Sequence, residues 1–561
     1  MLLALSLALL PQSTPAATPD AEALMPADLI GSMTLSSLDD LGLILDDLVA
    51  RLAPDRAEDV DLDALLDDLG LEGLDPDWLD RSRPVHFGLS IFDEDEDPTW
   101  TWVVPLSDGA ELPGDTFHLG EEADVLAQRR ASWLGLGAVG EYTPGLEAQA
   151  LLQGDVRDLV KMRLDTANLW DRYGEELSAS LDEERQELQD DVADQDLAAI
   201  MGPVLGMIDV MEDGLFALRH IELVANVDGT VVGTELKVSL APDTLVAGLK
   251  ALPGPTVEDV LPLFSADGDD LMVNTLDAGG LAPWTRPWLE VLFDFWAISD
   301  PVLEGEGVPF GPFEDLGAAF ESGRELAWPL LDLAELWLGP QAARLDMEMG
   351  TGPVGTAWLT HADPDALADA LRRVLTSELM ALLGLEVDEE EDGDGGLRLE
   401  CWIDYEVLAA LFQLPPEAAG FLQAELEPIL GPELNLLVSP FRGGTLLEIN
   451  EETRAGWAAA FEDPQPLRDA RVRWAAEGIA GAAPFMLQRI DLAAYLASYL
   501  RYAPDPADPE VPPELLRFLD RSALPVVTYL AIEERALRWG LTLDAGDLDD
   551  LGELVEALDS L

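Results

Sequence analysis

Residues 162–170 read MRLDTANLW, and residues 488–496 read QRIDLAAYL. Each stretch places an Arg two residues before an Asp, an Ala two residues after it, and a large apolar side chain two residues further on. An Asp at the end of a strand can accept hydrogen bonds from the free backbone amides of a helix that begins there. The two stretches therefore predict one strand-to-helix corner formed twice, with Asp165 and Asp491 as helix caps, rather than a catalytic Arg–Asp pair.

Similar elements surround both corners in the same order. They are a short strand followed by a helix (25–52 and 266–295), a first hairpin (83–107 and 343–362), a second pair of strands (131–142 and 434–450), and a hairpin that leads into a helix (222–252 and 528–558). Repetition of several elements in one order indicates a tandem duplication. Because the strands come as neighbouring hairpin pairs among amphipathic helices, the expected fold class is α+β with largely antiparallel sheets, in two diverged copies at 25–252 and 267–561.

The charge of the chain narrows the choice of partners. The 561 residues carry a formal net charge of −80, yet 48% of them are apolar, which is enough to build packed cores. Nucleic acids and anionic lipid surfaces are disfavoured as partners, because both require positive charge on the protein. The lysines are Lys161, Lys237 and Lys250 alone, a composition that suits either life in high salt or a genome biased towards Arg codons.

The N-terminus predicts export. Residues 1–10 form an apolar run that is too short to span a bilayer, and small residues follow it around 14–17. This pattern is typical of a signal peptide, here residues 1–20, so we expect a periplasmic or extracellular protein without a transmembrane span. The MPAD opener at 25–28, with its strand and helix, and the later Asp-Ala helix starts resemble large exported bacterial proteins of unknown function. The resemblance implies export and no particular chemistry.

Few residues are candidates for a binding site. Asp93, Asp95 and Asp97 in the turn DEDEDP are a weak calcium candidate, because alternate carboxylates can ligate Ca²⁺, although the Gly and Glu of an EF-hand are missing from their places. The run DEEEDGDGG at 388–396 is expected to form an exposed acidic loop. GLGAVG at 135–140 matches a dinucleotide-binding pattern, but no helix start follows it, so we expect a Gly-rich strand.

The remaining patterns assign no catalytic residue and no cofactor. The four histidines, His86, His118, His220 and His361, are scattered without the spacing of metal ligands. Cys401, the single cysteine, lies in an alternating stretch and is expected to be a buried strand residue. The sequence contains no G-x-S-x-G nucleophile elbow, and with 111 acidic residues no carboxylate pair stands out for glycoside hydrolysis.

These observations favour a non-catalytic, exported, highly acidic binding protein of the cell envelope, with a cleft for a ligand or partner between its two copies. One alternative is a secreted hydrolase whose carboxylate or metal site is assembled from distant residues, and a second is a structural envelope protein. An apolar groove would favour binding. A deep pocket with convergent acids and a His would favour the enzyme.

Overall fold

The three-dimensional structure of the chain is a computed structural model. It describes residues 24–25, 29–39, 42, 74–90, 99–119, 125–137, 158–193, 212, 215–228, 230–241, 263–264, 271–274, 325–333, 336, 341–348, 352–360, 362–392, 396–411, 414–415, 417–451, 453–462, 469–480, 482, 485–502, 519, 524–533 and 536–547. These residues form one large sheet and a set of helices around it.

The sheet contains nineteen strands among the described residues. The first half of the chain contributes β1 (Leu29–Leu35), β2 (Val85–Ser90), β3 (Thr99–Pro105), β4 (Thr116–Leu119), β5 (Val125–Arg130), β6 (Trp133–Gly137), β7 (Asp158–Leu164), β8 (Leu218–Asp228) and β9 (Val231–Leu240). The second half contributes β10 (Leu271–Asn274), β11 (Gln341–Glu348), β12 (Gly352–Leu359), β13 (Leu385–Asp392), β14 (Gly396–Ile403), β15 (Leu434–Phe441), β16 (Gly444–Ile449), β17 (Phe485–Asp491), β18 (Pro525–Glu533) and β19 (Ala536–Asp544). Neighbouring strands pair antiparallel throughout.

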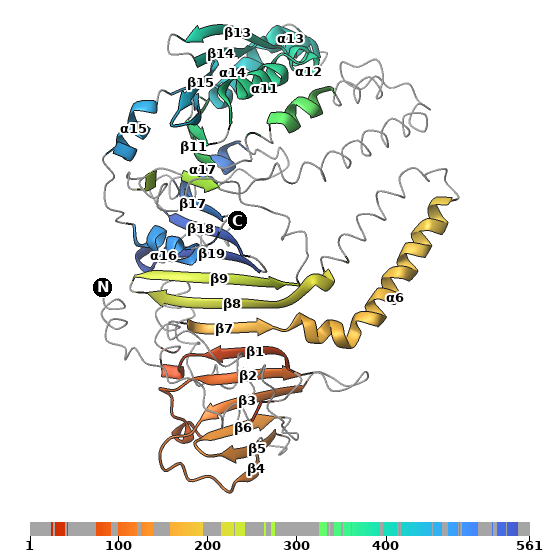
Figure 1. Cartoon of the computed structure of the whole chain (residues 1–561), viewed down its shortest axis with the longest axis vertical. Coiled ribbons are helices and arrows are strands. Elements are labelled where there is room, and N and C mark those ends of the chain that lie inside the picture. The colour runs from red at the N-terminus through yellow and green to blue at the C-terminus, as the bar shows by residue number, and fades with distance from the viewer. Residues whose placement is uncertain are drawn as a thin grey trace.

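The strands follow one continuous order from β4 at one end to β13 at the other (Figure 1). The order is β4-β5-β6-β3-β2-β1-β7-β8-β9-β19-β18-β17-β10-β11-β12-β16-β15-β14-β13. The pairing of β9 with β19 joins the halves. Outward from this junction, the strands of the first half follow the order 9-8-7-1-2-3-6-5-4, and those of the second half follow 19-18-17-10-11-12-16-15-14. When β13, the outermost strand, is left out, the strand at each position has the same rank along the chain in both halves.

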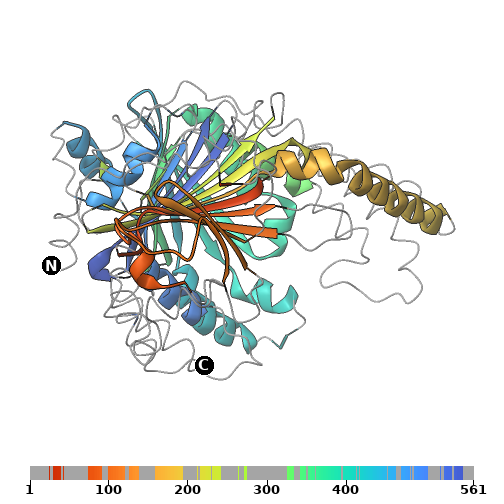
Figure 2. The same ribbon diagram turned by 90° about the horizontal axis from the view of Figure 1, so that it is seen from below.

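An open sheet of this many strands has to twist. Seen from below, the strands turn progressively along the sheet, and one long helix, α6 (Thr166–Ala193), projects away from it (Figure 2).

The two faces of the sheet carry different side chains. Face 1 is defined here by Met33, Met162 and Leu223, which lie opposite one another on β1, β7 and β8. Face 2 is defined by the residues that alternate with them, such as Lys161 and Glu222, because successive side chains of a strand point to opposite faces.

Helices pack on both faces. Besides α6, the labelled helices are η2 (Pro76–Trp78), α11 (Pro364–Leu375), α12 (Glu378–Leu382), α13 (Tyr405–Leu411), α14 (Ala418–Leu430), α15 (Arg454–Glu462), α16 (Ala470–Gly478), α17 (Leu492–Tyr502) and η7 (Ala545–Asp547), and residues 325–333 are helical as well. On face 1 of the second half, Leu367 of α11 belongs to one core cluster with Leu447 of β16. On face 2 beside the junction, Val472 of α16 belongs to another core cluster with Tyr529 of β18.

Both predicted corners are confirmed. Asp165 follows β7 and accepts a hydrogen bond from the backbone amide of Asn168, at 3.3 Å, in the first turn of α6. Asp491 ends β17 and accepts hydrogen bonds from the amides of Ala493 and Ala494, at 3.0 and 3.2 Å, in the first turn of α17. The sequence pattern therefore reports a strand-to-helix turn at both places.

The expected fold class is confirmed at its coarse level, since the chain is α+β with antiparallel strands and the sheet dominates. The expected acidic loop at 388–396 is wrong for residues 388–392 and 396, because β13 continues through Asp392 and pairs with β14, which begins at Gly396. Residues 393–395 lie outside the described residues. Two local interactions explain the difference. Val387 packs against a buried cluster on face 1, and the Glu389 carboxylate lies 2.7 Å from the Arg372 guanidinium of α11.

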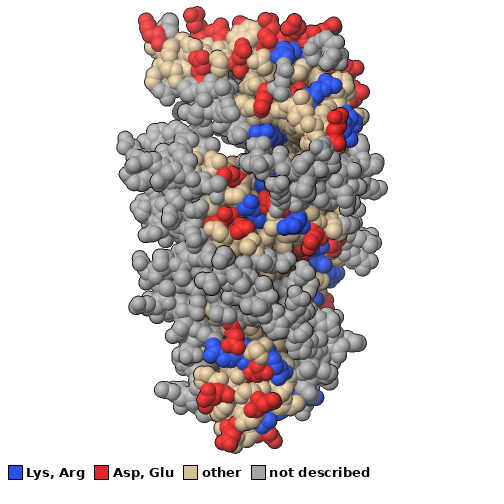
Figure 3. All heavy atoms as spheres, turned by 90° about the vertical axis from the view of Figure 1, so that its left-hand side faces the viewer, with Lys and Arg blue, Asp and Glu red and all other residues tan. Residues whose placement is uncertain are grey.

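Acidic side chains lie on the described surface at both ends of the molecule, with Lys and Arg among them (Figure 3). None of the helices in the described part of the chain has the length and apolar character needed to cross a membrane.

Candidate functional site

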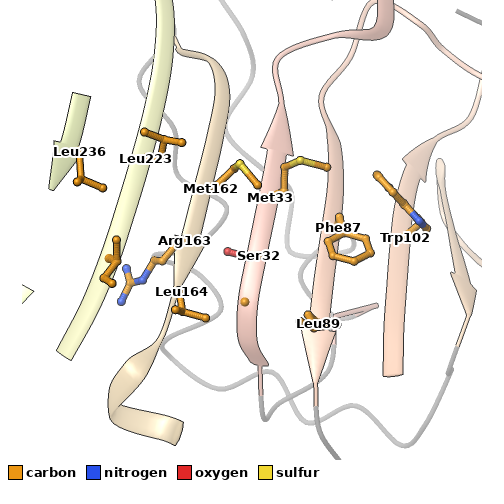
Figure 4. A pocket seen from close by; sticks show the side chains of 12 residues that line it. Ser32, Met33, Phe87, Leu89, Trp102, Met162, Arg163, Leu164, Leu223 and Leu236 are labelled. Atoms are coloured by element: carbon orange, nitrogen blue, oxygen red, sulfur yellow. The ribbon is translucent and has the colours of Figure 1, made fainter. Parts of the chain in front are cut away.

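An apolar trough lies on face 1 of the first half, beside the junction of the halves (Figure 4). Its volume is about 650 Å³. Strands β1, β2, β3, β7, β8 and β9 line it with Gly31, Ser32, Met33, Phe87, Leu89, Trp102, Met162, Arg163, Leu164, Ile221, Leu223 and Leu236. Ten of these twelve residues are Gly or apolar. A concave site of this size with an apolar lining is typical of binding sites for small molecules.

The strand register aligns the largest of these side chains in one row across the sheet. The row consists of Trp102 on β3, Phe87 on β2, Met33 on β1, Met162 on β7, Leu223 on β8, Leu236 on β9 and Trp539 on β19. The row runs perpendicular to the strands. It extends beyond the trough to β19, the strand of the second half that pairs with β9. At about 4.8 Å between neighbouring strands, seven strands give the row a length of about 29 Å.

Gly31 gives the trough its depth. It lies on β1 between Leu89 of β2 and Leu164 of β7, so the floor between two leucines has no side chain. A Cβ atom at Gly31 would lie 3.6 Å from Leu89 Cβ and 3.7 Å from the backbone oxygen of Arg163, which are ordinary contact distances. A larger residue at this position would therefore fill the trough without displacing the backbone.

The apolar side chains on this part of face 1 stay accessible. Met162, Leu223 and Trp539 are 45%, 42% and 42% exposed. Contiguous exposed apolar surface on a soluble protein usually marks a place where something binds.

The polarity of the faces is reversed between the halves. Beside the junction in the second half, face 2 is apolar, with Leu487 and Tyr529 buried in the cluster that includes α16, and face 1 carries Gln488 opposite Thr528. In the first half, face 2 is polar on β7 and β8, where Lys161 lies 3.2 Å from Glu222. These two strands thus turn their large apolar side chains to face 1, the face opposite α16.

Face 2 carries a partly buried charged cluster at the junction. The Glu235 carboxylate of β9 accepts hydrogen bonds from Arg538 Nε and Nη2 of β19, at 3.1 and 2.8 Å, and from the Tyr529 hydroxyl of β18. Burial raises the pKa of Glu235, but the hydrogen bonds from Arg538 and Tyr529 outweigh burial and hold that pKa below its usual value. The cluster links side chains of the two halves and leaves the acid ionised.

A second polar feature of face 2 lies where β7, β8 and β9 approach the start of α6. Ser239 Oγ and His220 Nε2 are 2.7 Å apart across the β8–β9 pair. Burial lowers the pKa of His220, and the nearby charge of Arg163 lowers it further. A neutral imidazole in contact with a hydroxyl is an arrangement that can activate a nucleophile.

The structure shows where some of the residues singled out from the sequence lie. Asp93, Asp95 and Asp97 lie outside the described residues. Cys401 is buried in β14, as expected, and burial raises the pKa of its thiol to about 11. The described part of GLGAVG belongs to β6, and Gly137 ends it at a φ of 107°, where a Cβ atom would lie 2.3 Å from the backbone oxygen of Trp100. The Gly-rich strand is thus confirmed for residues 135–137.

Metal binding has no visible basis in the described part of the chain, where no group of three or more His, Cys, Asp or Glu side chains could hold an ion.

Sequence reasoning missed the trough and the Ser239–His220 contact. A usable signal existed for the contact, because the short turn between Asp228 and Val231 fixes the hairpin register that places His220 opposite Ser239. The alternation of apolar and polar residues in β7 and β8 indicates strands with one apolar and one polar face. It does not indicate which face is covered by a helix. Nothing in the sequence around Gly31 marks it as the floor of a pocket.

Comparison with protein-family models, curated proteins and solved structures found no match to this chain. The class of protein is therefore defined by its own features, which are a continuous antiparallel sheet in two halves and an apolar trough beside their junction.

Proposed function

We propose that this protein is an exported binding protein of the cell envelope that holds an elongated apolar ligand in the trough on face 1. The carrying observation is the row of apolar side chains that crosses the sheet from Trp102, which is buried, to Trp539. Met162, Leu223 and Trp539 are the exposed members of this row. Covering apolar surface gains about 25 cal/mol for each Å² removed from water. A ligand that covers the exposed part of the row would therefore gain free energy of binding, because the described helices do not cover this surface.

The shape and charge of the site favour an uncharged, straight chain. The row is about 29 Å long by the strand spacing. A long, narrow floor of this kind fits an extended chain better than a compact ring system. The net charge of −80 repels an anionic head group. A neutral long-chain lipid is the ligand class that satisfies both conditions.

We also propose that the halves are diverged copies of one unit, at 25–252 and 267–561. The shared strand order outward from β9 and β19 supports this proposal, as does the recurrence of the Asp cap at Asp165 and Asp491. In this view, the two copies came to differ in which face of the sheet is apolar beside the junction. The second copy packs its apolar face against α16, and the first copy uses its apolar face to bind a ligand. Superposition of the two halves should align Asp165 with Asp491, and a mismatch of these two caps would refute the duplication.

Export rests on the N-terminal pattern of residues 1–20. The mature chain is expected to begin between residues 16 and 20. Intact-mass measurement of the native protein tests this step. A protein that retains Met1 and is found in a cytoplasmic fraction would contradict export.

Binding can be tested with Nile red, an uncharged dye that fluoresces in apolar surroundings. Straight-chain alcohols of increasing length should displace it. Each added methylene should tighten binding about fourfold, because burying one CH₂ contributes about 0.8 kcal/mol. The gain should stop once the chain fills the row. Failure of every chain length to displace the dye would favour the alternative of a structural envelope protein.

Two glycine variants make the test specific to the trough. Gly31→Leu should abolish dye binding while the melting temperature is maintained, because the new side chain occupies the floor without a backbone clash. Gly420→Leu on α14 is the matched control, since nothing lies within 4 Å of a Cβ atom at that position. Equal binding by the Gly31→Leu protein and the unmodified protein would refute the proposed site.

A further inference from the structure

Asp165, His220 and Ser239 form a row across face 2 that the binding function does not use. Leu164, the last residue of β7, lies opposite Ile221, which places the following residue, Asp165, beside His220. His220 lies directly opposite Ser239. We propose that this row is a nucleophilic site that cleaves carboxylic esters, with Ser239 as the nucleophile, His220 as the general base and Asp165 as a positioning residue. The row lies on face 2 and the trough on face 1, and of the residues named here only Arg163 borders both. The proposal does not depend on ligand binding in the trough.

The geometry fits the proton transfer that such a site requires. Ser239 Oγ lies 2.7 Å from His220 Nε2, which is within the range for a nucleophile and its base. The register places His220 between Ser239 on one side and Asp165, which follows β7, on the other. A carboxylate that accepts a proton from Nδ1 would hold the ring in the tautomer whose Nε2 accepts a proton from the hydroxyl.

The surroundings keep the base in its reactive form. Burial lowers the pKa of His220, and so do the charges of Arg163 and Lys237, whereas Glu222 and Asp165 raise it. The net effect is a pKa below the ordinary value of 6.5. The imidazole is therefore neutral near pH 7 and able to take the proton of Ser239.

Cationic groups stand beside the row on the same face. Arg163 is two residues from Asp165 on the same strand, and its Nη2 lies 3.9 Å from Asp165 Oδ2. Arg163 Nε is buried and makes no hydrogen bond within the described part of the chain. Lys237 is two residues from Ser239. Arg163 is two strands away from Ser239, whereas Lys237 is on the same strand as Ser239. Positive charge near a nucleophile can stabilise the negative oxygen of an acyl-transfer intermediate.

The row lies near the ends of its strands rather than at their centres. The row lies where β7 ends, β8 begins and β9 ends, beside the first turn of α6 (Figure 1). Ser239 is 8% exposed, and His220 is more accessible than Ser239. At the corresponding corner of the second half, the cap Asp491 lies opposite Pro525 rather than beside a histidine.

The reaction balances without a cofactor. Ser239 Oγ bonds to the ester carbonyl carbon while its proton passes to His220 Nε2, and the carbonyl electron pair moves to oxygen. When the C=O bond re-forms, the C–O bond to the alcohol breaks, and the leaving oxygen takes the proton from Nε2. Water then attacks the acyl-serine by the same route. The products are one acid and one alcohol, and the serine is regenerated.

A fluorophosphonate probe tests the site on the full, unmodified chain. Ser239 Oγ should form a P–O bond with the probe and release fluoride, and peptide mass spectrometry should locate the label at Ser239. The labelling rate should rise with pH through a value below 6.5 and then level off, as the imidazole loses its proton. A folded protein that takes up no label, or takes it up at another serine, overturns the proposal.

Variants separate the nucleophile from a structural serine. Ser239→Ala should remove the label, and His220→Gln should slow labelling about a hundredfold or more. Ser178→Ala on α6, whose hydroxyl donates to Glu212, is the control and should label at the unmodified rate. Persistent labelling in the Ser239→Ala protein overturns the assignment.

The test of Asp165 requires a measurement that depends on its positioning role and not on its role as a helix cap. Asn caps helices about as well as Asp, so Asp165→Asn should keep the melting temperature while it lowers the labelling rate about a hundredfold. Asp491→Asn is the matched control at the other corner and should change neither. Equal labelling rates in the two Asn variants would show that Asp165 is only a cap.

Discussion

The Glu235 carboxylate accepts a hydrogen bond from the Tyr529 hydroxyl, a contact between the two halves of the chain. Gly540 lies directly opposite Glu235 across the junction of β9 and β19. A Cβ atom at Gly540 would lie 2.1 Å from Tyr529 Cε1, so the tyrosine ring passes over the glycine to reach the acid. The close packing and the hydrogen bond at the centre of the sheet therefore depend on each other.

Removing the charge of Glu235 should weaken the junction. Glu235→Gln leaves Arg538 partly buried without its main carboxylate, and we expect a loss of about 2 kcal/mol in the free energy of unfolding. Tyr529→Phe removes one hydrogen bond and should cost about 1 kcal/mol. Urea denaturation measures both. Glu533→Gln, which alters the more exposed partner of Arg538, is the control and should cost less than either. Equal losses in all three variants would contradict a special role of Glu235.

His86 should make the protein sensitive to mild acid. Its side chain is buried on β2, with Nδ1 3.0 Å from Thr34 Oγ1 and the ring centroid 5.7 Å from that of Trp133. Burial, assisted by the charge of Arg83, lowers the pKa of His86 to about 4. The unfolded chain keeps the ordinary value of 6.5 and so binds the proton more readily than the folded protein.

The stability that the neutral His86 confers is fully present above pH 6.5 and is lost as the pH falls towards 4. The loss should reach about 3 kcal/mol, at about 1.4 kcal/mol for each pKa unit. Urea midpoints measured across this range should fall less steeply in His86→Gln than in the unmodified protein. His118→Gln, at an exposed position of β4, should leave the slope unchanged. Parallel curves for the two variants would refute the assignment to His86.

Local signals made the corners and hairpins predictable. Asp165 and Asp491 cap helices through amides two or three residues away, so a nine-residue stretch contains the whole motif. The strand order was not predictable in the same way. β1 pairs with β2 on one edge and with β7 on the other, and β9 pairs with β19, so these contacts join segments that are far apart in the chain.

The candidate sites were harder to predict, since each depends on what lies across from a residue. Alternation in β7 and β18 is similar, yet Met162 on one is accessible and Tyr529 on the other is buried, because α16 packs on face 2 near the junction. Gly31 forms a floor only because Leu89 and Leu164 are its neighbours in the register.

The two caps should differ in strength. Asp491 accepts hydrogen bonds from the amides of Ala493, Ala494 and Leu524, at 3.0, 3.2 and 3.1 Å, whereas Asp165 accepts one amide bond, at 3.3 Å, from Asn168. We expect Asp491→Ala to cost about 2 kcal/mol and Asp165→Ala about 1 kcal/mol in the free energy of unfolding. Chemical denaturation checks the order. A larger loss at Asp165 than at Asp491 would show that the additional bonds at Asp491 are not decisive.

Salt should stabilise the folded protein. At a net charge of −80, like charges repel one another across the surface, and the screening length falls from about 30 Å at 0.01 M salt to about 3 Å at 1 M. We expect the melting temperature to rise over this range, and NaCl and CaCl₂ to act alike at equal ionic strength. If Asp93, Asp95 and Asp97 bind calcium, CaCl₂ should instead give an additional, saturating rise that their triple Asp→Asn variant loses. Melting that does not respond to NaCl would show that the acidic side chains are already balanced within the fold.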